Sequence, residues 1–543
     1  MSTVHMNTAR STVLAAPVAL TLALVATACG PAEPTKPNNA SSKPGGAYSV
    51  ALTEPDHLLP GRTTSSYSLQ VLQGLFDPPA SLDPKDGTVK PLAALSWTTE
   101  DNVVWTVKFR SGTTFHNGEK VTATSFADAW NAAAYGPNGW DSNYYFAQIK
   151  GYDALNPAKE GANPTARTLS GLEVVDETTL RVTLKAPFGQ FPMLLSFPAF
   201  APLPKAAIAK PDVFDIAPIG NGPYQLDGQW ERNQKIKLKK FAAYGGPRKA
   251  MADRIDFKIY TSRETAFTEL QAGNVDVLTT VPAANSMQAK RLFGERFSIR
   301  PSGTMDYLGL PVKDPRFADP RIRKAISMAI DRKGITQAIY NGVYKPATSV
   351  VGDMIPGHRP GACGKTCAYD PAAAKKLFDE AGGFDGPLEL YFSNSDATYE
   401  QWMTSVANQL KDNLGIQDVK FRKMAPADLS PLLNEGRNKG PFRQNWVIDY
   451  PSIQNYLDGL YYPGNRSGWS NKEFDSLVAK GNAAEGGEAI AAYQEAEDIV
   501  LRDLPYIPLW NWQDQSAWSD RIGNVVIDSY AAGLHLDRVT VNH

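Results

Sequence analysis

Two hydrophobic periodicities alternate along most of the chain, and this alternation is the strongest constraint on its fold. Over residues 103–110, apolar side chains at every second position predict a half-buried strand, which Ser111 and Gly112 end. The same period recurs at 180–185 and 255–259. Between such segments the period becomes that of a helix: Pro320 opens a stretch with one apolar stripe, made of Ile322, Ala325, Ile326, Ala329 and Ile330. The pattern predicts a mixed α/β class.

The length of the chain indicates more than one domain. A single hydrophobic core rarely serves 543 residues, so two or three domains are expected. A further helix is predicted to begin at Asp370-Pro371 and to end at Gly382. No short-period repeat interrupts the alternation of strands and helices.

The first 28 residues have the pattern of an export signal. Arg10 precedes an uncharged apolar run over residues 12–28, which is short for a membrane span. The run closes on Ala26-Thr27-Ala28-Cys29-Gly30, which resembles a bacterial lipobox, although that motif prefers leucine where Ala26 stands. A plain secretory signal is the alternative. The sequence therefore predicts a signal peptide over 1–28 and lipidation of Cys29, which would anchor an extracytoplasmic protein to the cell membrane.

Residues 29–46 are expected to form the lipidated end and a disordered tether. Pro, Gly, Ser, Asn and Lys dominate the segment, and such residues cannot bury enough apolar surface to offset the entropy of ordering. Beyond it, Cys363 and Cys367 are the remaining cysteines. Outside the cytoplasm, two cysteines so close in sequence favour a disulfide, and they are too few for a tetrahedral zinc site.

Charge and motifs argue against several function classes. The chain carries 55 basic and 56 acidic residues, whereas nucleic-acid binding needs a basic surplus. The six histidines are scattered and none forms a helical metal-binding pair. No serine stands in a Gly-x-Ser-x-Gly elbow. We therefore expect a protein that is not an enzyme and has no cofactor or metal; a secreted hydrolase remains an alternative, because catalytic triads form in space rather than in sequence.

Five segments, in order along the chain, resemble a known family. They read WTVKFRSGTTFHNGEKVTATSFADAW at 105–130, PIGNGPY at 218–224, ELQAGNVDV at 269–277, DPRIRKAISMAID at 319–331 and YDPAAAKKLFDEAG at 369–382. Together they are similar to landmarks of extracytoplasmic solute-binding proteins of family 5, the peptide/nickel class. Most have structural roles: Gly220 and Gly222 are expected to serve a tight turn with unusual φ values, and His116 to be packed or solvated rather than a ligand.

The resemblance implies a periplasmic-binding-protein-like fold, a Venus flytrap of two lobes plus an inserted domain. Lobe I would comprise residues 47–76, 205–303 and 516–543, the inserted domain 77–204, and lobe II 304–515. The chain would then cross between the lobes twice, and closure of the lobes around a ligand is a plausible consequence.

The resemblance also implies a ligand site. The family places a ligand-binding carboxylate in a Trp-x-x-Asp-Tyr segment, and this chain has Trp446, Asp449 and Tyr450 in that pattern. A buried peptide ammonium needs an anion, which Asp449 would supply; alternatively, Asp449 organises the turn before Pro451. The other predicted wall residues are Ser65, Ser66, Tyr67, Tyr144 and Tyr145.

The expected function is that of the substrate-binding component of an ABC importer for oligopeptides. The implied partners are the peptide ligand, two permease subunits with cytoplasmic ATPases, and the membrane through the lipid anchor. The protein itself is expected to be a monomer. The alternatives are the same fold binding an oligosaccharide or a nickel chelate, and a peptide that acts as a signal rather than as a nutrient.

Overall fold

The residues described by the computed structural model are 44–157, 161–384, 386–530 and 533–542. The predicted signal peptide, Cys29 and most of the tether lie outside these ranges. The predicted α/β class is confirmed, because strands and helices alternate from β1 (Ala47–Leu52) to β19 (Thr540–Val541). The patterned segments correspond to strands β5 (Val104–Phe109), β7 (Thr179–Thr183) and β10 (Arg254–Ile259), and to helices α10 (Pro320–Met328) and α12 (Pro371–Glu380).

Each of the two helices α10 and α12 begins just after a capping aspartate. The carboxylates of Asp319 and Asp370 accept hydrogen bonds from backbone N–H groups in the first turns of α10 and α12. All five residues of the stripe in 322–330 are buried. Gly382 follows α12 with φ +86°, a left-handed conformation that glycine adopts without steric cost.

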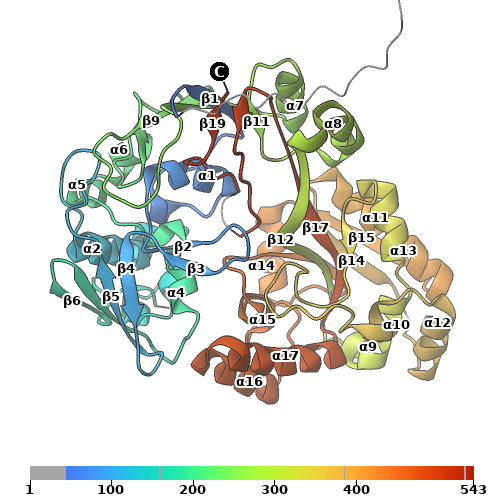
Figure 1. The fold of residues 1–543 in the computed structure, drawn as a ribbon. Coiled ribbons are helices and arrows are strands. Elements are labelled where there is room, and N and C mark those ends of the chain that lie inside the picture. The colour runs from blue at the N-terminus through green and yellow to red at the C-terminus, as the bar shows by residue number, and fades with distance from the viewer. Residues whose placement is uncertain (1–43, 158–160, 385, 531–532, 543) are drawn as a thin grey trace, which may run out of the picture. The chain divides into compact units, whose positions relative to one another are not determined.

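Most strands join one large mixed sheet (Figure 1). Its order is β15 (Val419–Met424), β14 (Leu388–Ser393), β16 (Phe442–Val447), β12 (Phe297–Gly309), β17 (Tyr506–Trp518), β11 (Val277–Leu278), β1, β10, β9 (Lys235–Lys240) and β8 (Tyr224–Leu226). The short β13 (Lys345–Pro346) pairs with β17 outside this path.

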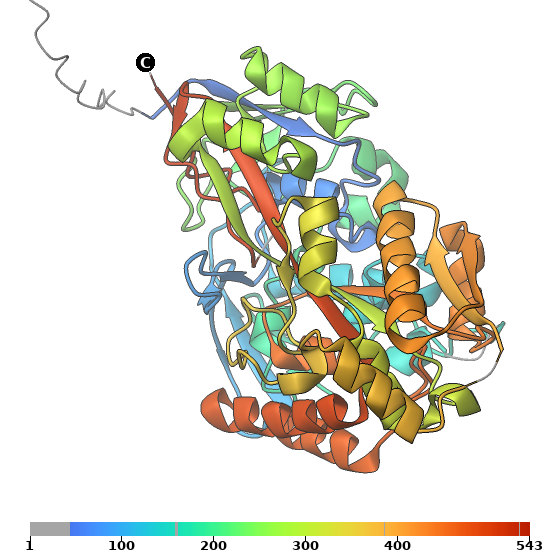
Figure 2. The ribbon, with the colours of Figure 1, turned by 90° about the vertical axis from the view of Figure 1, so that its right-hand side faces the viewer.

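Two 13-residue strands, β12 and β17, lie side by side in this sheet, with β15, β14 and β16 on one side and β11, β1, β10, β9 and β8 on the other. Strands β12 and β17 pair antiparallel, from Phe297 opposite Ala517 to Gly309 opposite Tyr506, with an irregularity between Pro301 and Met305. Figure 2 shows β17 as the long red strand that crosses the view diagonally. The boundaries predicted at 303/304 and 515/516 fall inside these two strands. The division into lobes stays a prediction.

Around residues 304–310 the sheet is covered on both faces. Met305 and Tyr307 pack in one apolar cluster with α15 (Ile453–Tyr461) and α17 (Gly486–Asp503). Leu308 and Leu310 pack in another, with α10, α11 (Arg332–Tyr340) and α13 (Ala397–Leu414). Alternate side chains of a strand point to opposite faces, so helices on both sides explain why this segment is buried throughout.

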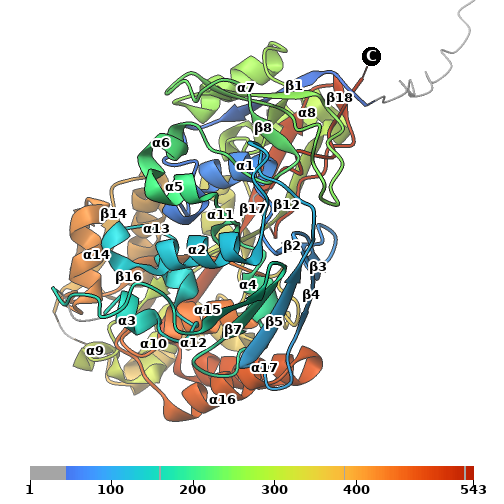
Figure 3. The ribbon, with the colours of Figure 1, turned by 90° about the vertical axis from the view of Figure 1, so that its left-hand side faces the viewer.

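Residues 80–203 add a smaller layer. Strands β4 (Ala94–Thr98), β5, β7 and β6 (Leu172–Asp176) form an antiparallel four-stranded sheet, which lies beside α2 (Ala123–Ala134) in Figure 3. Residues of this layer share one continuous apolar cluster with β1, β9 and β10. Residues 80–91 of the same layer form a two-stranded hairpin, made of β2 (Ala80–Leu82) and β3 (Val89–Pro91).

The two glycines of PIGNGPY serve close approach between chain segments, not unusual backbone angles. Neither has a positive φ, which corrects the expectation from the sequence. A Cβ atom on Gly220 would lie 1.9 Å from the carbonyl oxygen of Leu75, and one on Gly222 would lie 2.6 Å from that of Gly74. The segment therefore lies directly against the last turn of α1 (Ser66–Leu75).

His116 holds this contact in place. Its Nδ1 accepts a hydrogen bond from the Gly220 N–H over 3.1 Å, and its Nε2 donates to the Gly222 carbonyl over 3.1 Å. Burial lowers the pKa of His116 to about 4, so the ring is neutral at pH 7 and can accept at one nitrogen and donate at the other. Of the two roles expected for His116, the packed one is confirmed, and it links two family landmarks.

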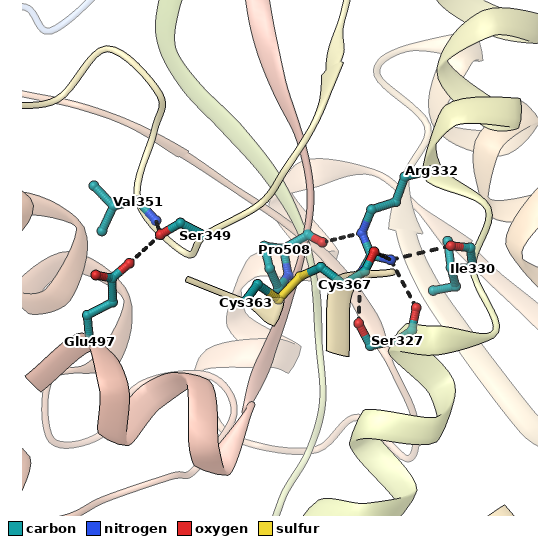
Figure 4. Close-up of a disulfide and its surroundings, with 9 residues drawn as sticks. All are labelled: Ser327, Ile330, Arg332, Ser349, Val351, Cys363, Cys367, Glu497 and Pro508. Atoms are coloured by element: carbon teal, nitrogen blue, oxygen red, sulfur yellow. Dashed lines mark hydrogen bonds between the residues drawn. A yellow bond between two sulfur atoms is a disulfide. The ribbon is translucent and has the colours of Figure 1, made fainter. Parts of the chain in front are cut away.

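Cys363 and Cys367 are bonded to each other, as predicted (Figure 4). The carbonyl of Cys367 accepts a hydrogen bond from Arg332, a buried residue at the start of α11. The same guanidinium donates to the carbonyls of Ser327 and Pro508, and burial lowers the pKa of Arg332 to about 10. The disulfide loop thus supplies one of the backbone acceptors that stabilise a buried positive charge.

Within the part of the chain that the structure describes, no helix is long and apolar enough to cross a bilayer.

Candidate ligand-binding site

A cavity of about 680 Å³ lies where several distant chain segments meet. Its size is that of a site for a small ligand. Apolar side chains form most of the wall, and polar groups converge at a few points. The lining comes from α1 and the residues that follow it, from Tyr144 and Tyr145, from residues 196–198, from Arg248, from residues 445–449 at the end of β16, and from Tyr530, His535, Asp537 and Arg538.

Asp449 projects into this cavity from the turn between β16 and α15. Asn455, in the first turns of α15, fixes it twice: its Oδ1 accepts from the Asp449 backbone N–H, and its Nδ2 donates to the Asp449 carboxylate, both over 3.1 Å. The Trp446 indole N–H donates to the same Asn455 oxygen over 2.9 Å. Because the turn geometry depends on Asn455, the orientation of the carboxylate is set before any ligand arrives.

Trp446 is held by close packing against α15. A Cβ atom on Gly459 would lie 2.1 Å from the Trp446 ring, so only glycine leaves room for the indole there. Trp446 lines the cavity beside Asp449. Aromatic rings offer large contact area with few rotatable bonds, which suits a ligand wall.

Two tyrosines from the smaller layer reach the same carboxylate. Tyr144 and Tyr145 lie on a 3-10 helix, η3 (Asn143–Phe146), and their rings are 4.2 Å apart between centroids. Their hydroxyls donate to Asp449 Oδ1 over 3.2 Å and 2.7 Å. Burial, followed by the nearby Asp449 charge, raises the pKa of both hydroxyls, so they stay protonated donors at neutral pH.

The Asp449 carboxylate is surrounded by donors but not by cations. It accepts hydrogen bonds from Tyr144, Tyr145 and Asn455, all neutral groups. Burial raises the pKa of Asp449, which the three hydrogen bonds only partly offset. Among the described residues, no Lys, Arg or His nitrogen lies within 4.0 Å of it. The site therefore offers an anion that no cation of the described residues balances.

The other predicted site residues divide into two groups. Ser66 lines the cavity with Trp446, Asp449, Tyr144 and Tyr145. Ser65, Tyr67 and Tyr450 do not. The Ser65 N–H donates to Thr63, the Tyr67 hydroxyl accepts from Arg263 over 3.0 Å beside a separate small void, and Tyr450 is buried with its hydroxyl donating to Gln454.

Sequence reasoning missed most of the wall. Leu72, Phe76, Leu82, Leu92 and Phe197 supply apolar surface, Arg248, Asp537 and Arg538 supply charge, and His535 supplies an imidazole ring. No local pattern marks these residues, because each belongs to an ordinary strand, helix or loop and they come together only in the fold.

Comparison with known proteins gives the family. Residues 88–468 match the family described as bacterial extracellular solute-binding proteins, family 5 Middle. The chain is 27% identical over 458 residues to the glutathione-binding protein GsiB of Escherichia coli (strain K12), which covers 80% of this chain and 82% of the relative. Its identity to the GsiB protein of Salmonella typhi is 28%, with the same coverage.

Solved structures share the fold. The murein tripeptide binding protein MppA of Escherichia coli superposes with a TM-score of 0.74 at 23% identity, over 92% of this chain and 98% of that one. OppA of Burkholderia pseudomallei superposes with a TM-score of 0.74 at 24% identity, over 92% and 99%. The periplasmic-binding-protein-like fold predicted from the sequence is thereby confirmed, and the chain belongs to the bacterial extracellular solute-binding proteins of family 5.

Proposed function

We propose that this protein is the substrate-binding component of an ABC importer and that it captures oligopeptides in the cavity beside Asp449. The observation that carries the proposal is the half-buried Asp449 carboxylate, which three neutral donors orient and no cation of the described residues balances. A peptide brings an α-ammonium group. Pairing that ammonium with Asp449 compensates both charges when the cavity excludes water.

The rest of the cavity suits the rest of a peptide. The apolar wall can accept side chains of differing shape, and Trp446 and Tyr144 give flat contact surfaces. The names of the relatives agree with this ligand class: the curated relatives are called glutathione-binding, and one structural neighbour is called a murein tripeptide binding protein. Binding and release, rather than catalysis, is the role we propose.

We further propose that the protein acts as a monomer outside the cytoplasm and delivers its ligand to a permease with cytoplasmic ATPases. The signal-like run over 12–28, the lipobox-like segment at Cys29 and the Pro/Ser/Asn-rich residues that follow support a lipid-anchored, tethered protein.

The test of the ligand class is a thermal-shift screen of the purified protein, followed by calorimetry on the hits. A ligand at about a hundred times its dissociation constant adds about 2.7 kcal/mol of stability, which is readily detected. We expect stabilisation by peptides of three to six residues, and weaker binding of the same peptides after N-acetylation. Stabilisation by oligosaccharides or nickel alone, or equal affinity for free and acetylated peptides, would contradict the proposal.

Anchoring is tested at Cys29. A single acyl chain gives only weak membrane attachment, so stable retention needs the several chains that a bacterial lipoprotein carries. We expect Cys29→Ala to move the protein from the membrane fraction to the medium or periplasm, as followed by fractionation. Mass spectrometry should find lipid on the N-terminal cysteine of the native protein. A soluble native protein with an unmodified N-terminus would refute lipidation.

A further inference from the structure

The charges that line the cavity are not evenly compensated. Apart from tyrosines, five ionisable side chains among the described residues line it: Arg248, Asp449, His535, Asp537 and Arg538. The hydrogen bonds and ion pairs of each side chain show whether it has a charged partner among the described residues. A charged group that the fold already satisfies has little to offer a ligand, whereas an unsatisfied one has much.

Arg248 is already satisfied, and Asp537 shares this arginine with Asp77. The Arg248 guanidinium forms a short ion pair with Asp77 and donates to the carbonyls of Gln73 and Phe76 over 2.7 Å and 3.2 Å. Asp537 lies 3.9 Å from the same guanidinium. This arrangement fixes the end of α1 and raises the pKa of Arg248, so its charge is permanent and already balanced.

His535 is also satisfied. Its Nε2 lies within hydrogen-bond distance of the Asp528 carboxylate, whose side chain is fully buried. The arginine at the start of β16, Arg443, pairs with Asp306 over 2.9 Å and stacks on Tyr399, and it does not line the cavity. Only Asp449 and Arg538 are then left among the five.

The Arg538 side chain is exposed at the cavity wall, and none of the described residues forms a hydrogen bond or ion pair with its guanidinium. Its backbone, in contrast, is firmly held. The Arg538 carbonyl accepts from Asn524 over 2.8 Å, and the Arg538 N–H donates to the His535 carbonyl over 3.1 Å. Just before it, the Leu536 carbonyl accepts from the Tyr48 hydroxyl over 3.0 Å. The guanidinium is thus presented from a fixed point.

We propose that Arg538 binds the carboxylate of a peptide whose ammonium group is bound by Asp449, so that the cavity selects ligands with both termini free. The inference rests on the proposed peptide-binding function and adds a second, oppositely charged contact to it. Among the described residues, Asp449 has no cationic partner and Arg538 no anionic one, and such a pair in a single cavity of about 680 Å³ matches a short zwitterion. A guanidinium also suits this task, because its two parallel N–H donors fit a carboxylate.

The test compares four forms of one tripeptide identified by the screen: free, N-acetylated, C-amidated, and doubly blocked. Amidation is expected to weaken binding to the native protein about tenfold, because a charge-assisted hydrogen bond at an exposed group lies near the weak end of its range. Arg538→Gln should weaken binding of the free peptide to a similar extent. It should have no further effect on the amide, since both changes remove the same contact.

Two controls separate this contact from structural effects. Arg538→Gln should leave the melting temperature of the ligand-free protein unchanged, because the guanidinium has no partner to lose among the described residues. Arg437→Gln removes an exposed arginine whose one ion-pair partner among the described residues is the exposed Glu435; it does not line the cavity, so the change should not alter the affinity for either peptide. Arg538→Lys should restore part of the affinity for the free acid.

The outcomes distinguish the two proposals. If acetylation weakens binding but the acid and the amide bind native protein equally, peptide capture stands and the role of Arg538 is wrong. If Arg538→Gln weakens acid and amide alike, the residue shapes the wall rather than binding a carboxylate, and the inference again fails. If no peptide in the screen binds, the peptide-binding function itself is refuted, and the carboxylate contact with it.

Discussion

Replacing Asp449 by asparagine is expected to lower the affinity for a well-bound peptide by about 30-fold to several thousand-fold. Removing one partner of a buried charge pair typically costs about 2–5 kcal/mol or more, at about 1.4 kcal/mol for each tenfold change in affinity. Asp537, the other carboxylate among the described lining residues, cannot replace Asp449 as partner of the ammonium, because it lies beside Arg248. Calorimetric titration of both proteins with the same peptide measures the effect.

The decisive comparison is a cycle with the acetylated peptide. Acetylation should weaken binding to the native protein strongly and to Asp449→Asn only slightly, because both changes remove one interaction. Asp458→Asn is the matched control: its carboxyl group lies nearby on α15, bonds Gln454 and does not line the cavity. If Asp449 only organised its turn, Asp449→Asn would lower the melting temperature of the ligand-free protein and acetylation would have no special effect.

The pH dependence of binding gives an independent measurement. Burial raises the pKa of Asp449, so the folded protein holds this proton more tightly than the unfolded chain does. Ionisation of Asp449 therefore destabilises the ligand-free protein as the pH rises from the unfolded pKa through the folded one. An ammonium ligand prefers the ionised form. Affinity should fall as the pH is lowered through that raised pKa in the native protein, but not in Asp449→Asn.

The second large effect is expected at Gly220. Gly220→Ala should destabilise the fold by about 3 kcal/mol or more, at the upper end for overpacking, because the new methyl group meets backbone rather than a movable side chain. The Cβ atom would be placed 1.9 Å from the Leu75 carbonyl oxygen. The chain must then separate at the end of α1, which carries Ser66 and Leu72 of the cavity wall. Chemical denaturation followed by tryptophan fluorescence measures the loss.

Gly245→Ala is the control for this prediction. A Cβ atom there would have its nearest neighbour at 3.7 Å, an ordinary contact, and Gly245 has no positive φ. Its denaturation midpoint should therefore stay close to that of the native protein. If Gly220→Ala proved as stable as Gly245→Ala, the close contact between PIGNGPY and α1 would not exist in the folded protein.

Local sequence patterns predicted the regular elements well, because their causes are local. The alternation over residues 103–110 is the pleat of β5, and the spacing of Ile322, Ala325 and Ile326 is the buried face of α10. The role of Gly220 was misjudged because a glycine in a loop has two explanations, unusual φ or lack of space. Only the position of Leu75, 145 residues earlier, decides between them.

Only the site residues that belong to a short sequence motif could be predicted with the correct position. Asp449 and Trp446 share one short segment, and the structure places both at the cavity, whereas Tyr67 lies one residue from Ser66 and points elsewhere. Adjacent residues of a helix diverge by about 100°, so an error of one position changes the surface that a side chain faces. Arg538 could not be identified from the sequence, because its importance depends on contacts in the fold: Arg248 and His535 have charged partners, whereas Arg538 has none among the described residues.

Because the disulfide joins two cysteines that lie close together in the sequence, a fluorescent label can be attached to the protein at one chosen site. Residues 44–543 contain no cysteine besides Cys363 and Cys367, which are bonded to each other. A chain that starts at residue 44 and carries Val447→Cys would therefore present a single reactive thiol. Val447 lines the cavity and is 58% exposed. A polarity-sensitive dye attached there would change its emission when a solute displaces water, which would turn the protein into a fluorescent sensor for its own ligand.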